Sequence, residues 1–332
     1  MFNTMCIGGN RSLDTNLRDP FYEANILVTG GAGFIGSHLI KRLVAYGANV
    51  FTIIRESSNL WRLNNCIQDI KIIKLDLRSK YALRSCIEEI MPEYVFHMAA
   101  YGVDYRNNDY IEAITTNVIG ITNLVEALSG MGCRKIINAG SGMEYGCSEG
   151  TIIEQTRLNP NNIYGSSKAA ATLIAHQIAK DLDLSIVTLR PFGIYGEFEN
   201  PSRLFAQIIL SALNNIEIKL TGCKQLRDYT YIGNIVDGLL MSAANDELQN
   251  EILNIGSGTS YQLKYYIELI FDCLGTKSSP VYGAIPYRQH DLCKSEPDIS
   301  SIKKLLGWEP AVNLENGIRR TVEWFKNNAQ LY

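Results

Sequence analysis

The segment that decides the fold is Ile26-Leu27-Val28-Thr29-Gly30-Gly31-Ala32-Gly33-Phe34-Ile35-Gly36-Ser37-His38-Leu39. An apolar run leads directly into closely spaced glycines, and a helical pattern follows them. Backbone N–H groups at the start of such a helix can face a pyrophosphate, because glycines leave the approach open. The pattern therefore predicts a dinucleotide-binding turn, and the alternative is an ordinary tight turn. The residues expected to contact the cofactor there are Gly30, Gly33, Phe34, Ile35 and Gly36.

From Asn25 onward, short apolar runs alternate with longer amphipathic runs. We predict strands at 26–29, 49–54, 71–75, 94–98, 135–139 and 185–189, and helices at 37–46, 82–90, 118–128 and 169–179. Strands and helices in this order form a parallel sheet with right-handed crossovers. The sequence therefore predicts an α/β fold, a Rossmann-type doubly wound parallel sheet.

The alternation stops after Pro191, where turn residues become frequent. We expect a dinucleotide-binding domain at 25–190 and a smaller C-terminal substrate-binding lobe. The segments assigned to that lobe are 191–230 and 256–332. A return segment near 231–255 rejoins the first domain, and residues 1–24 form a polar N-terminal extension.

The composition excludes several classes of partner. The 332 residues carry 31 Lys and Arg against 34 Asp and Glu, a net charge of −3, with no basic block to attract nucleic acid or anionic lipid. Apolar runs are too short to cross a bilayer, and the first residues are too polar for a signal peptide. We expect a soluble cytoplasmic protein that binds neither nucleic acid nor a membrane.

The eight cysteines and four histidines are dispersed along the chain. Their spacing matches neither a disulfide framework nor a zinc site, so we predict reduced cysteines and no bound metal.

A second signal is Tyr164-Gly165-Ser166-Ser167-Lys168 at the start of a long apolar helical segment. Residues four apart share a helix face, so the ammonium of Lys168 is expected beside the phenol of Tyr164, where it would lower the pKa of that phenol. Upstream, the predicted strand at 135–139 is followed by Ser141, which puts a hydroxyl at the edge of the sheet where α/β proteins bind ligands.

With these motifs in this order, the chain resembles the extended short-chain dehydrogenase/reductase family of nucleotide-sugar enzymes, also called the NAD-dependent epimerase/dehydratase family. The glycines match its T-G-x-x-G-x-x-G signature, and the resemblance extends from Ile26 to about Phe325. The other matching stretches are Asp76-Leu77, His97–Ala100, Asn117, Arg190-Pro191-Phe192, Arg227–Ile232, Leu253–Gly258 and Leu306–Pro310.

The resemblance implies a role for each matching residue. Ser141, Tyr164 and Lys168 form the catalytic set, and Tyr164 and Lys168 also contact the cofactor. Further cofactor contacts are Asp76 and Leu77 near the adenine, then Ala99, Ala100 and Pro191. Residues expected to bind the nucleotide-diphosphate sugar are Tyr101, Ser141, Gly142, Arg203, Arg227 and Arg288.

Departures from the family pattern reduce the number of reactions that this chain is expected to catalyse. Dehydratases of the family have an Asp-Glu pair after the catalytic hydroxyl, whereas this chain has Gly142 and Met143. Glu144 comes one residue later, and strand alternation would turn it away from the site as a solvent-exposed or outer carboxylate. Many epimerases of the family have Asn where this chain has Gly193. The resemblance to epimerases is therefore weaker for the residues that contact the substrate phosphates.

The residues after the second predicted strand bear on the cofactor. Arg55 stands where an acidic residue would bind the ribose hydroxyls of NAD, and this favours NADP. Ser57 and Arg62 can add donors to the 2′-phosphate, while Glu56 leaves NAD open, and Arg55 can also be an ordinary surface charge.

The function predicted from these features is NADP-dependent reduction of the 4-keto group of a nucleotide-linked 4-keto-6-deoxy sugar, in deoxysugar biosynthesis for a surface polysaccharide. Tyr164 would donate the proton, Ser141 would hydrogen-bond the developing alkoxide, and Lys168 would hold the nicotinamide ribose. The stretches at 140–146 and 99–102 resemble CDP-paratose or CDP-abequose synthase-type reductases. The alternative is a nucleotide-sugar 4-epimerase with tightly held NAD, and a third possibility is a non-catalytic cofactor-binding protein.

The segment at 169–179 is apolar almost all round, which predicts a homodimer in which it packs with the helix at 118–128. The alternative is that the segment is buried within one chain.

Overall fold

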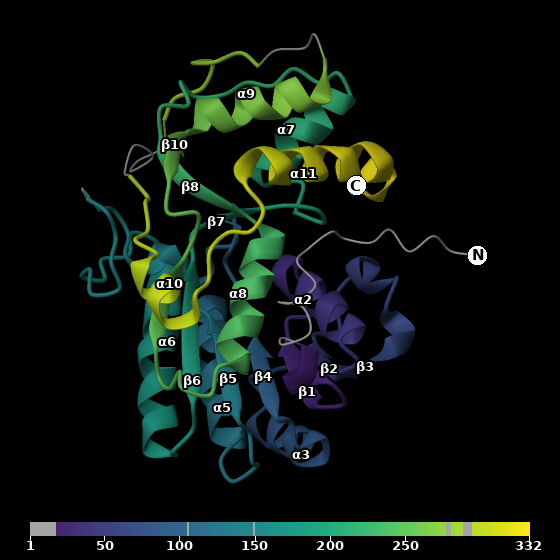
Figure 1. Cartoon of the computed structure of the whole chain (residues 1–332), viewed down its shortest axis with the longest axis vertical. Coiled ribbons are helices and arrows are strands. Elements are labelled where there is room, and N and C mark those ends of the chain that lie inside the picture. The colour runs from purple at the N-terminus through teal and green to yellow at the C-terminus, as the bar shows by residue number, and fades with distance from the viewer. Residues whose placement is uncertain (1–17, 105, 149, 277–279, 288–293) are drawn as a thin grey trace.

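The computed structural model describes residues 18–104, 106–148, 150–276, 280–287 and 294–332 (Figure 1). Its centre is a parallel sheet of seven strands in the order β3-β2-β1-β4-β5-β6-β9. These strands are β1 (Asn25–Thr29), β2 (Asn49–Ile54), β3 (Ile70–Lys74), β4 (Tyr94–His97), β5 (Lys135–Ala139), β6 (Ile186–Pro191) and β9 (Ile252–Ile255). The Rossmann-type α/β fold predicted from the sequence is confirmed.

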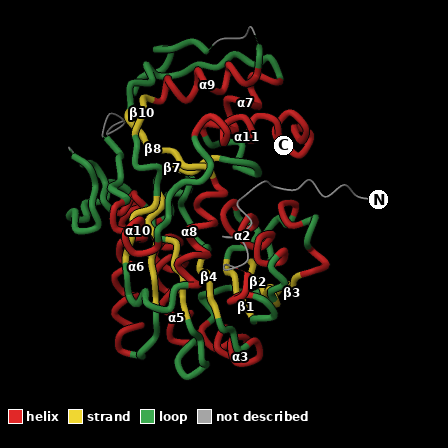
Figure 2. Tube along the Cα trace, in the orientation of Figure 1, coloured by secondary structure: helices red, strands yellow, loops and turns green. Residues whose placement is uncertain are grey.

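Helices cover both faces of this sheet, as Figure 2 shows. One face packs against α2 (Phe34–Ala45) and α8 (Ile232–Ala244). The other face packs against α3 (Lys80–Ile90), α5 (Gly120–Ala127) and α6 (Ile163–Asp181). Because both faces are covered, the central strands are buried along nearly their whole length, which explains their continuous apolar runs.

A short helical stretch precedes α5. It consists of α4 (Tyr110–Ala113) and the π-helix η4 (Ile114–Ile119), so the helix predicted at 118–128 belongs to a longer helical run. The single-turn 3₁₀ helices are η1 (Asp19–Phe21), η2 (Trp61–Leu63), η3 (Ile67–Asp69), η5 (Gly142–Glu144) and η6 (Ala329–Leu331).

The chain after β6 builds a second, smaller sheet, and then returns through α8 to add β9 beside β6. This mixed sheet has the order β10-β8-β7 and lies above the main sheet in Figure 1. Its elements and the helices around it are β7 (Gly193–Tyr195), α7 (Leu204–Leu213), β8 (Leu226–Tyr231), β10 (Ser260–Gln262), α9 (Leu263–Leu274), α10 (Ser300–Leu306) and α11 (Leu314–Asn328).

Two sequence predictions need correction at this level. Part of the predicted N-terminal extension belongs to the core, because Phe21 is completely buried against the rings of Tyr94 and Phe96. Cys147 is disulfide-bonded rather than reduced. Cysteine spacing carried no signal for this bond because Cys147 has no cysteine near it in the sequence. Cys66, Cys86, Cys133 and Cys273 are free thiols.

Within the described ranges, no helix is long and apolar enough to cross a membrane. The same part of the chain contains no group of three or more His, Cys, Asp or Glu side chains placed to hold a metal ion.

Candidate active site

The glycine-rich turn lies between β1 and α2. Gly30 has φ +70°, and a Cβ there would lie 2.7 Å from the backbone N of Ala99, so only glycine fits between the two loops. Gly33 is the N-cap of α2, and the first N–H groups of the helix, at Phe34, Ile35 and Gly36, therefore point outward without an intrahelical acceptor. This cradle suits a dinucleotide pyrophosphate.

Ser141, Tyr164 and Lys168 converge at the carboxyl end of β5. Ser141 begins η5 two residues after the strand, and Tyr164 and Lys168 lie one turn apart at the start of α6. A side-chain hydrogen bond joins Ser141 to Tyr164. Between the two α6 residues, Gly165 lies directly against the carbonyl of Met143, so the η5 turn rests on the helix. The structure therefore brings the predicted catalytic set together.

The electrostatics of this set differ from the sequence prediction. Burial raises the pKa of Tyr164, and the hydrogen bond from Ser141 and the charge of Arg203 only partly oppose the rise. Burial also lowers the pKa of Lys168 to about 8, opposed by the carboxylate of Glu144. The predicted lowering of the tyrosine pKa by Lys168 is therefore wrong for this state, because desolvation outweighs the neighbouring charges. Tyr164 is held as a neutral phenol that can donate a proton.

The loop at 99–102 is fixed against α6 by one side chain. Asn117, in η4, accepts a hydrogen bond from the N–H of Tyr101 at 2.7 Å and donates to the Tyr101 carbonyl at 2.9 Å. It also donates to the hydroxyl of Ser167 on α6 at 2.8 Å. Ala99 lies against Gly30 of the glycine turn, and Gly102 lies against the side chain of Tyr164.

Arg55 follows the last residue of β2, as predicted. Its side chain is 58% exposed, with Nη1 3.9 Å from a carboxylate oxygen of Glu112. Ser57 is also exposed. Glu56, the alternative ribose ligand, has its carboxylate 2.7 Å from the ammonium of Lys74. Arg55 and Ser57 are therefore accessible to a ligand at this edge of the sheet.

Two other residues predicted at the adenosine end already have protein partners. Arg62 donates through Nε to the carbonyl of Phe198 at 2.8 Å, and its guanidinium lies over the ring of Trp61. The carboxylate of Asp76 accepts hydrogen bonds from the backbone N–H, Nε and Nη2 of Arg78, which hold its pKa below the usual range. Arg62 is thus less available to a 2′-phosphate than Arg55. Leu77, next to Asp76, is buried.

The predicted substrate side lies opposite Tyr164. Arg203 is the N-cap residue of α7, and Nη1 donates to the carbonyl of Val103 at 3.3 Å, within electrostatic reach of Tyr164. Arg227 lies in β8, and both arginines act on the pKa of Tyr229. Pro191 ends β6, and Arg288 lies outside the described residues. The structure thus places both described arginines near one tyrosine.

Comparison with known proteins identifies the architecture. Residues 26–256 match the model of the NAD dependent epimerase/dehydratase family. The chain belongs to this family. The resemblance inferred from the sequence motifs is confirmed at this level.

Individual relatives match over almost the whole chain. The UDP-glucose 4-epimerase of Mycolicibacterium smegmatis is 30% identical, over 92% of this chain and 99% of its own. The crystal structure of UDP-glucose 4-epimerase from Thermotoga maritima with UDP-glucose is 30% identical, with a TM-score of 0.84, covering 92% of this chain and 99% of that one. The dTDP-glucose 4,6-dehydratase of Bacillus anthracis in complex with NAD is 26% identical, with a TM-score of 0.83, covering 93% and 98%.

Gly142 is a close-packed position in this family member. A Cβ on Gly142 would lie 3.0 Å from the ring of Phe192, which is stacked on Tyr145. Met143 is 45% exposed and carries no group that can transfer a proton. The two positions after Ser141 therefore hold neither an acid nor a base.

For Glu144, the solvent-exposed alternative predicted from the sequence is wrong, whereas the outer-carboxylate alternative is compatible with its buried position. Glu144 is completely buried, and its carboxylate contacts the guanidinium of Arg190 at 2.8 Å. Strand alternation had predicted a side chain turned away from the site, but β5 ends at Ala139 and residues 142–144 form a 3₁₀ turn. Arg190 belongs to a stretch that matches the family pattern, but its pairing with Glu144 has no local sequence signal, because Arg190 lies on β6, far along the chain.

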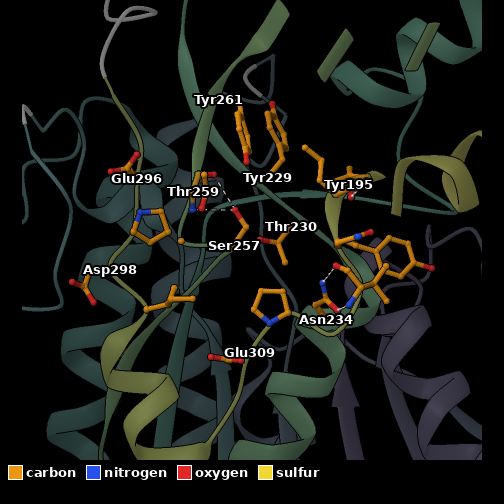
Figure 3. Close-up of a pocket in the computed structure, with 18 of the residues that line it drawn as sticks. Tyr195, Tyr229, Thr230, Asn234, Ser257, Thr259, Tyr261, Glu296, Asp298 and Glu309 are labelled. Atoms are coloured by element: carbon orange, nitrogen blue, oxygen red, sulfur yellow. Dashed lines mark hydrogen bonds between the residues drawn. The ribbon is translucent and has the colours of Figure 1, made fainter. Parts of the chain in front are cut away.

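A cavity of about 770 Å³ lies elsewhere in the protein, between β8, β10 and the segment 296–315. Figure 3 shows the rings of Tyr261 and Tyr229 at one end and Glu309 toward the other. Two of its carboxylates are already paired, Glu296 with Lys294 at 2.9 Å and Glu309 with Lys303. Its described lining contains none of the three predicted catalytic side chains, so it is separate from the catalytic centre.

Proposed function

We propose that this protein is a nucleotide-sugar 4-epimerase that uses tightly held NAD. The observation that carries the proposal is the hydrogen bond between Ser141 and a neutral, buried Tyr164, one helical turn from Lys168. This is the acid/base arrangement needed to move a proton on and off a sugar hydroxyl. The two 4-epimerases among the relatives described above support the reaction, and the NAD-bound relative supports the cofactor.

The chain's own residues would act as follows. NAD, when bound, would supply the hydride acceptor and donor for the C4 carbon of the sugar. As a phenolate stabilised by the Lys168 cation, Tyr164 would remove the proton of the C4 hydroxyl and become the neutral phenol. It would return that proton when the opposite face of the C4 carbonyl is reduced, while Ser141 donates a hydrogen bond to the same oxygen. Lys168 would hold the nicotinamide ribose, and the N–H groups of Phe34 to Gly36 the pyrophosphate.

The residues after Ser141 argue against a dehydratase. Elimination of water needs an acid and a base beside the catalytic hydroxyl, but Gly142 is packed against Phe192 and Met143 is apolar. The intact catalytic set argues against a non-catalytic cofactor-binding protein.

The test combines cofactor content with turnover. Purified protein is denatured, the released dinucleotide is quantified, and the untreated protein is incubated with UDP-glucose and UDP-glucuronate. We expect bound NAD and interconversion of a 4-epimer pair without added cofactor. Protein free of NAD that consumes NADPH instead would reject the epimerase.

The 4-keto reductase predicted from the sequence remains a second candidate, because Arg55 is exposed at the end of β2 and can meet a 2′-phosphate. Its assay is NADPH consumption with CDP-, dTDP- and GDP-4-keto-6-deoxy sugars. Arg55→Asp should then weaken NADPH binding by about 2–4 kcal/mol relative to NADH. Equal use of NADH and NADPH by the unaltered protein would make Arg55 a surface charge.

We also propose the ligand contacts and the assembly. A nucleotide-diphosphate sugar would lie between Tyr164 and the two arginines Arg203 and Arg227, which can pair with its phosphates. Two copies of the chain would pair through α5 and α6.

A further inference from the structure

Glu144 occupies an unusual place for a carboxylate, because three separate elements donate to it in the interior. Oε1 accepts hydrogen bonds from the backbone N–H of Ser141 at 2.9 Å and from the hydroxyl of Thr172, on α6, at 3.2 Å. Oε2 accepts from Nε of Arg190, on β6, at 2.8 Å. Glu144 is 0% exposed and the Arg190 side chain 3% exposed, so solvent hardly screens the pair.

The first consequence concerns the direction of the Ser141 hydroxyl. The hydroxyl oxygen accepts a hydrogen bond from the N–H of Met143 at 3.1 Å, while Glu144 accepts from the N–H of Ser141, so the two residues form a capping box. Because an N–H already donates to the hydroxyl oxygen, the hydroxyl proton is free to be donated toward Tyr164 or a substrate oxygen.

The second consequence concerns charge. The Glu144 carboxylate raises the pKa of Tyr164 and of Lys168, which favours the neutral phenol and the charged ammonium. The neutral phenol is the state that donates a proton to the C4 oxygen in the reducing half of the reaction, and the ammonium is the state that can hold a ribose. The titratable and charged groups around this pair are Arg190 on β6, Lys168, Tyr164 and His176 on α6, and Tyr145 beside Glu144.

Arg190 extends the arrangement away from the site. Its Nη1 donates to the hydroxyl of Tyr145 at 2.8 Å, and that hydroxyl donates to Oδ1 of Asn254, on β9, at 2.8 Å. The guanidinium is therefore fixed independently of Glu144, and it can hold the carboxylate in one place.

We propose that Glu144, held by Arg190, is a positioning residue that fixes the turn at Ser141 and so orients the Ser141 hydroxyl toward Tyr164. This inference rests on the proposed function, in which Ser141, Tyr164 and Lys168 perform the proton transfer. Glu144 touches neither substrate nor cofactor and acts through its neighbours.

The test uses Glu144→Gln, which keeps the size of the side chain and removes its charge. We expect kcat to fall by about 10- to 100-fold while KM for the nucleotide sugar changes by less than about twofold, because orientation rather than binding is lost. The alkaline limb of the kcat–pH profile should move to lower pH, since the carboxylate no longer supports the charged lysine.

A double variant covers the case in which Glu144→Gln does not fold. Glu144→Leu with Arg190→Met removes both charges together and leaves no unpaired ion in the core. It should show the same loss of kcat and the same shift of the profile. The control is Asp237→Asn, which breaks the 2.9 Å ion pair between Asp237 and Arg42 on the other face of the sheet and should change neither.

A titration without substrate separates this proposal from the proposed function. Phenolate absorbance is measured against pH in the unaltered protein and in the Glu144→Gln variant. The same titration is made after Tyr164→Phe is added to each of the two proteins. Subtracting the second curve from the first leaves the contribution of Tyr164 alone. The Tyr164 transition should lie at lower pH in the Glu144→Gln protein. If no nucleotide sugar is turned over, the proposed function fails while this titration still decides the role of Glu144. An unshifted transition, or a fall in kcat with an unshifted pH profile, would overturn the positioning role.

Discussion

Tyr164 combines burial with a hydrogen bond from Ser141, and the two act on its pKa in opposite directions. Desolvation is the larger effect, so the side chain remains a phenol over the neutral range. A phenol of this kind can give its proton to an alkoxide as it forms, and it can take that proton back only if a neighbouring cation stabilises the phenolate. Its position therefore matters more to catalysis than an intrinsically low pKa.

At this scale we predict that Tyr164→Phe keeps the fold and the affinity for the dinucleotide but lowers kcat by about 10²- to 10⁴-fold, the usual contribution of a positioned acid/base. Turnover and cofactor binding are measured on the same preparation. The matched control is Tyr81→Phe. Tyr81 lies on α3 and is 88% exposed, so this variant should behave like the unaltered protein. Near-normal turnover of Tyr164→Phe would exclude the mechanism.

The helical run through η4 positions the cofactor loop, because its π-turn points Asn117 at the backbone of Tyr101. π-Turns are rare in proteins overall, but those that do occur are often found at functional sites. Asn117 is buried and makes three hydrogen bonds, so any replacement leaves buried polar groups without partners.

We therefore predict that Asn117→Ala lowers the free energy of unfolding by about 2–4 kcal/mol and weakens dinucleotide binding, because buried donors and acceptors lose their partner. Urea unfolding and equilibrium binding measure the two effects. Asn214→Ala, on the exposed end of α7, should change stability by less than about 0.5 kcal/mol. Equal effects of the two variants would contradict this role of Asn117.

The parts of the site that were predictable from sequence are those set by local geometry. Gly30 and its neighbours follow from a strand leading into a helix, and Tyr164 and Lys168 from their spacing of four on one helix. The π-turn was missed because it shifts the apolar spacing of residues 110–119 away from the helical period. Glu144 was misplaced because a two-residue strand period was carried beyond β5, and Arg190 could be found only through the packing of β6.

Across the whole molecule, the three described histidines are held neutral by burial. The pKa falls from 6.5 to about 3 for His97, and to about 4 for His38 and His176. The pKa of each histidine is lower in the folded than in the unfolded state. Between the folded and unfolded pKa values, the unfolded chain therefore binds more protons than the folded chain. The resulting stability is present above pH 6.5 and is lost as pH falls toward 4.

We predict that the free energy of unfolding falls by roughly 1–2 kcal/mol per histidine between about pH 7.5 and pH 5. Urea unfolding at the two pH values measures the change. His176→Gln should make the dependence shallower, because one of the three groups no longer titrates. A stability that does not vary over this range would show that the histidines are already solvated in the folded chain.

The outer face of α6 carries the surface expected for pairing of two chains. Leu173 is 56% exposed and Ile174 38% exposed, beside Ile119 of η4 at 42%. We predict a dimer at micromolar concentration by sedimentation equilibrium, because such a patch gains from being covered. Leu173→Arg should yield monomers, whereas Tyr81→Arg, on α3, should not. A monomeric mass for the unaltered protein would reject the dimer.

The seventh strand gives the molecule a particular folding history. β9 is synthesised after β7, α7, β8 and α8, yet its partner is β6, which precedes all of them. During synthesis β6 is therefore an unpaired edge strand until β9 is made, and its free backbone groups can pair with other chains. We expect a fragment ending at Pro191 to aggregate on expression while the full chain remains dispersed, and we expect refolding to be slow, because the last strand pairing closes a long loop.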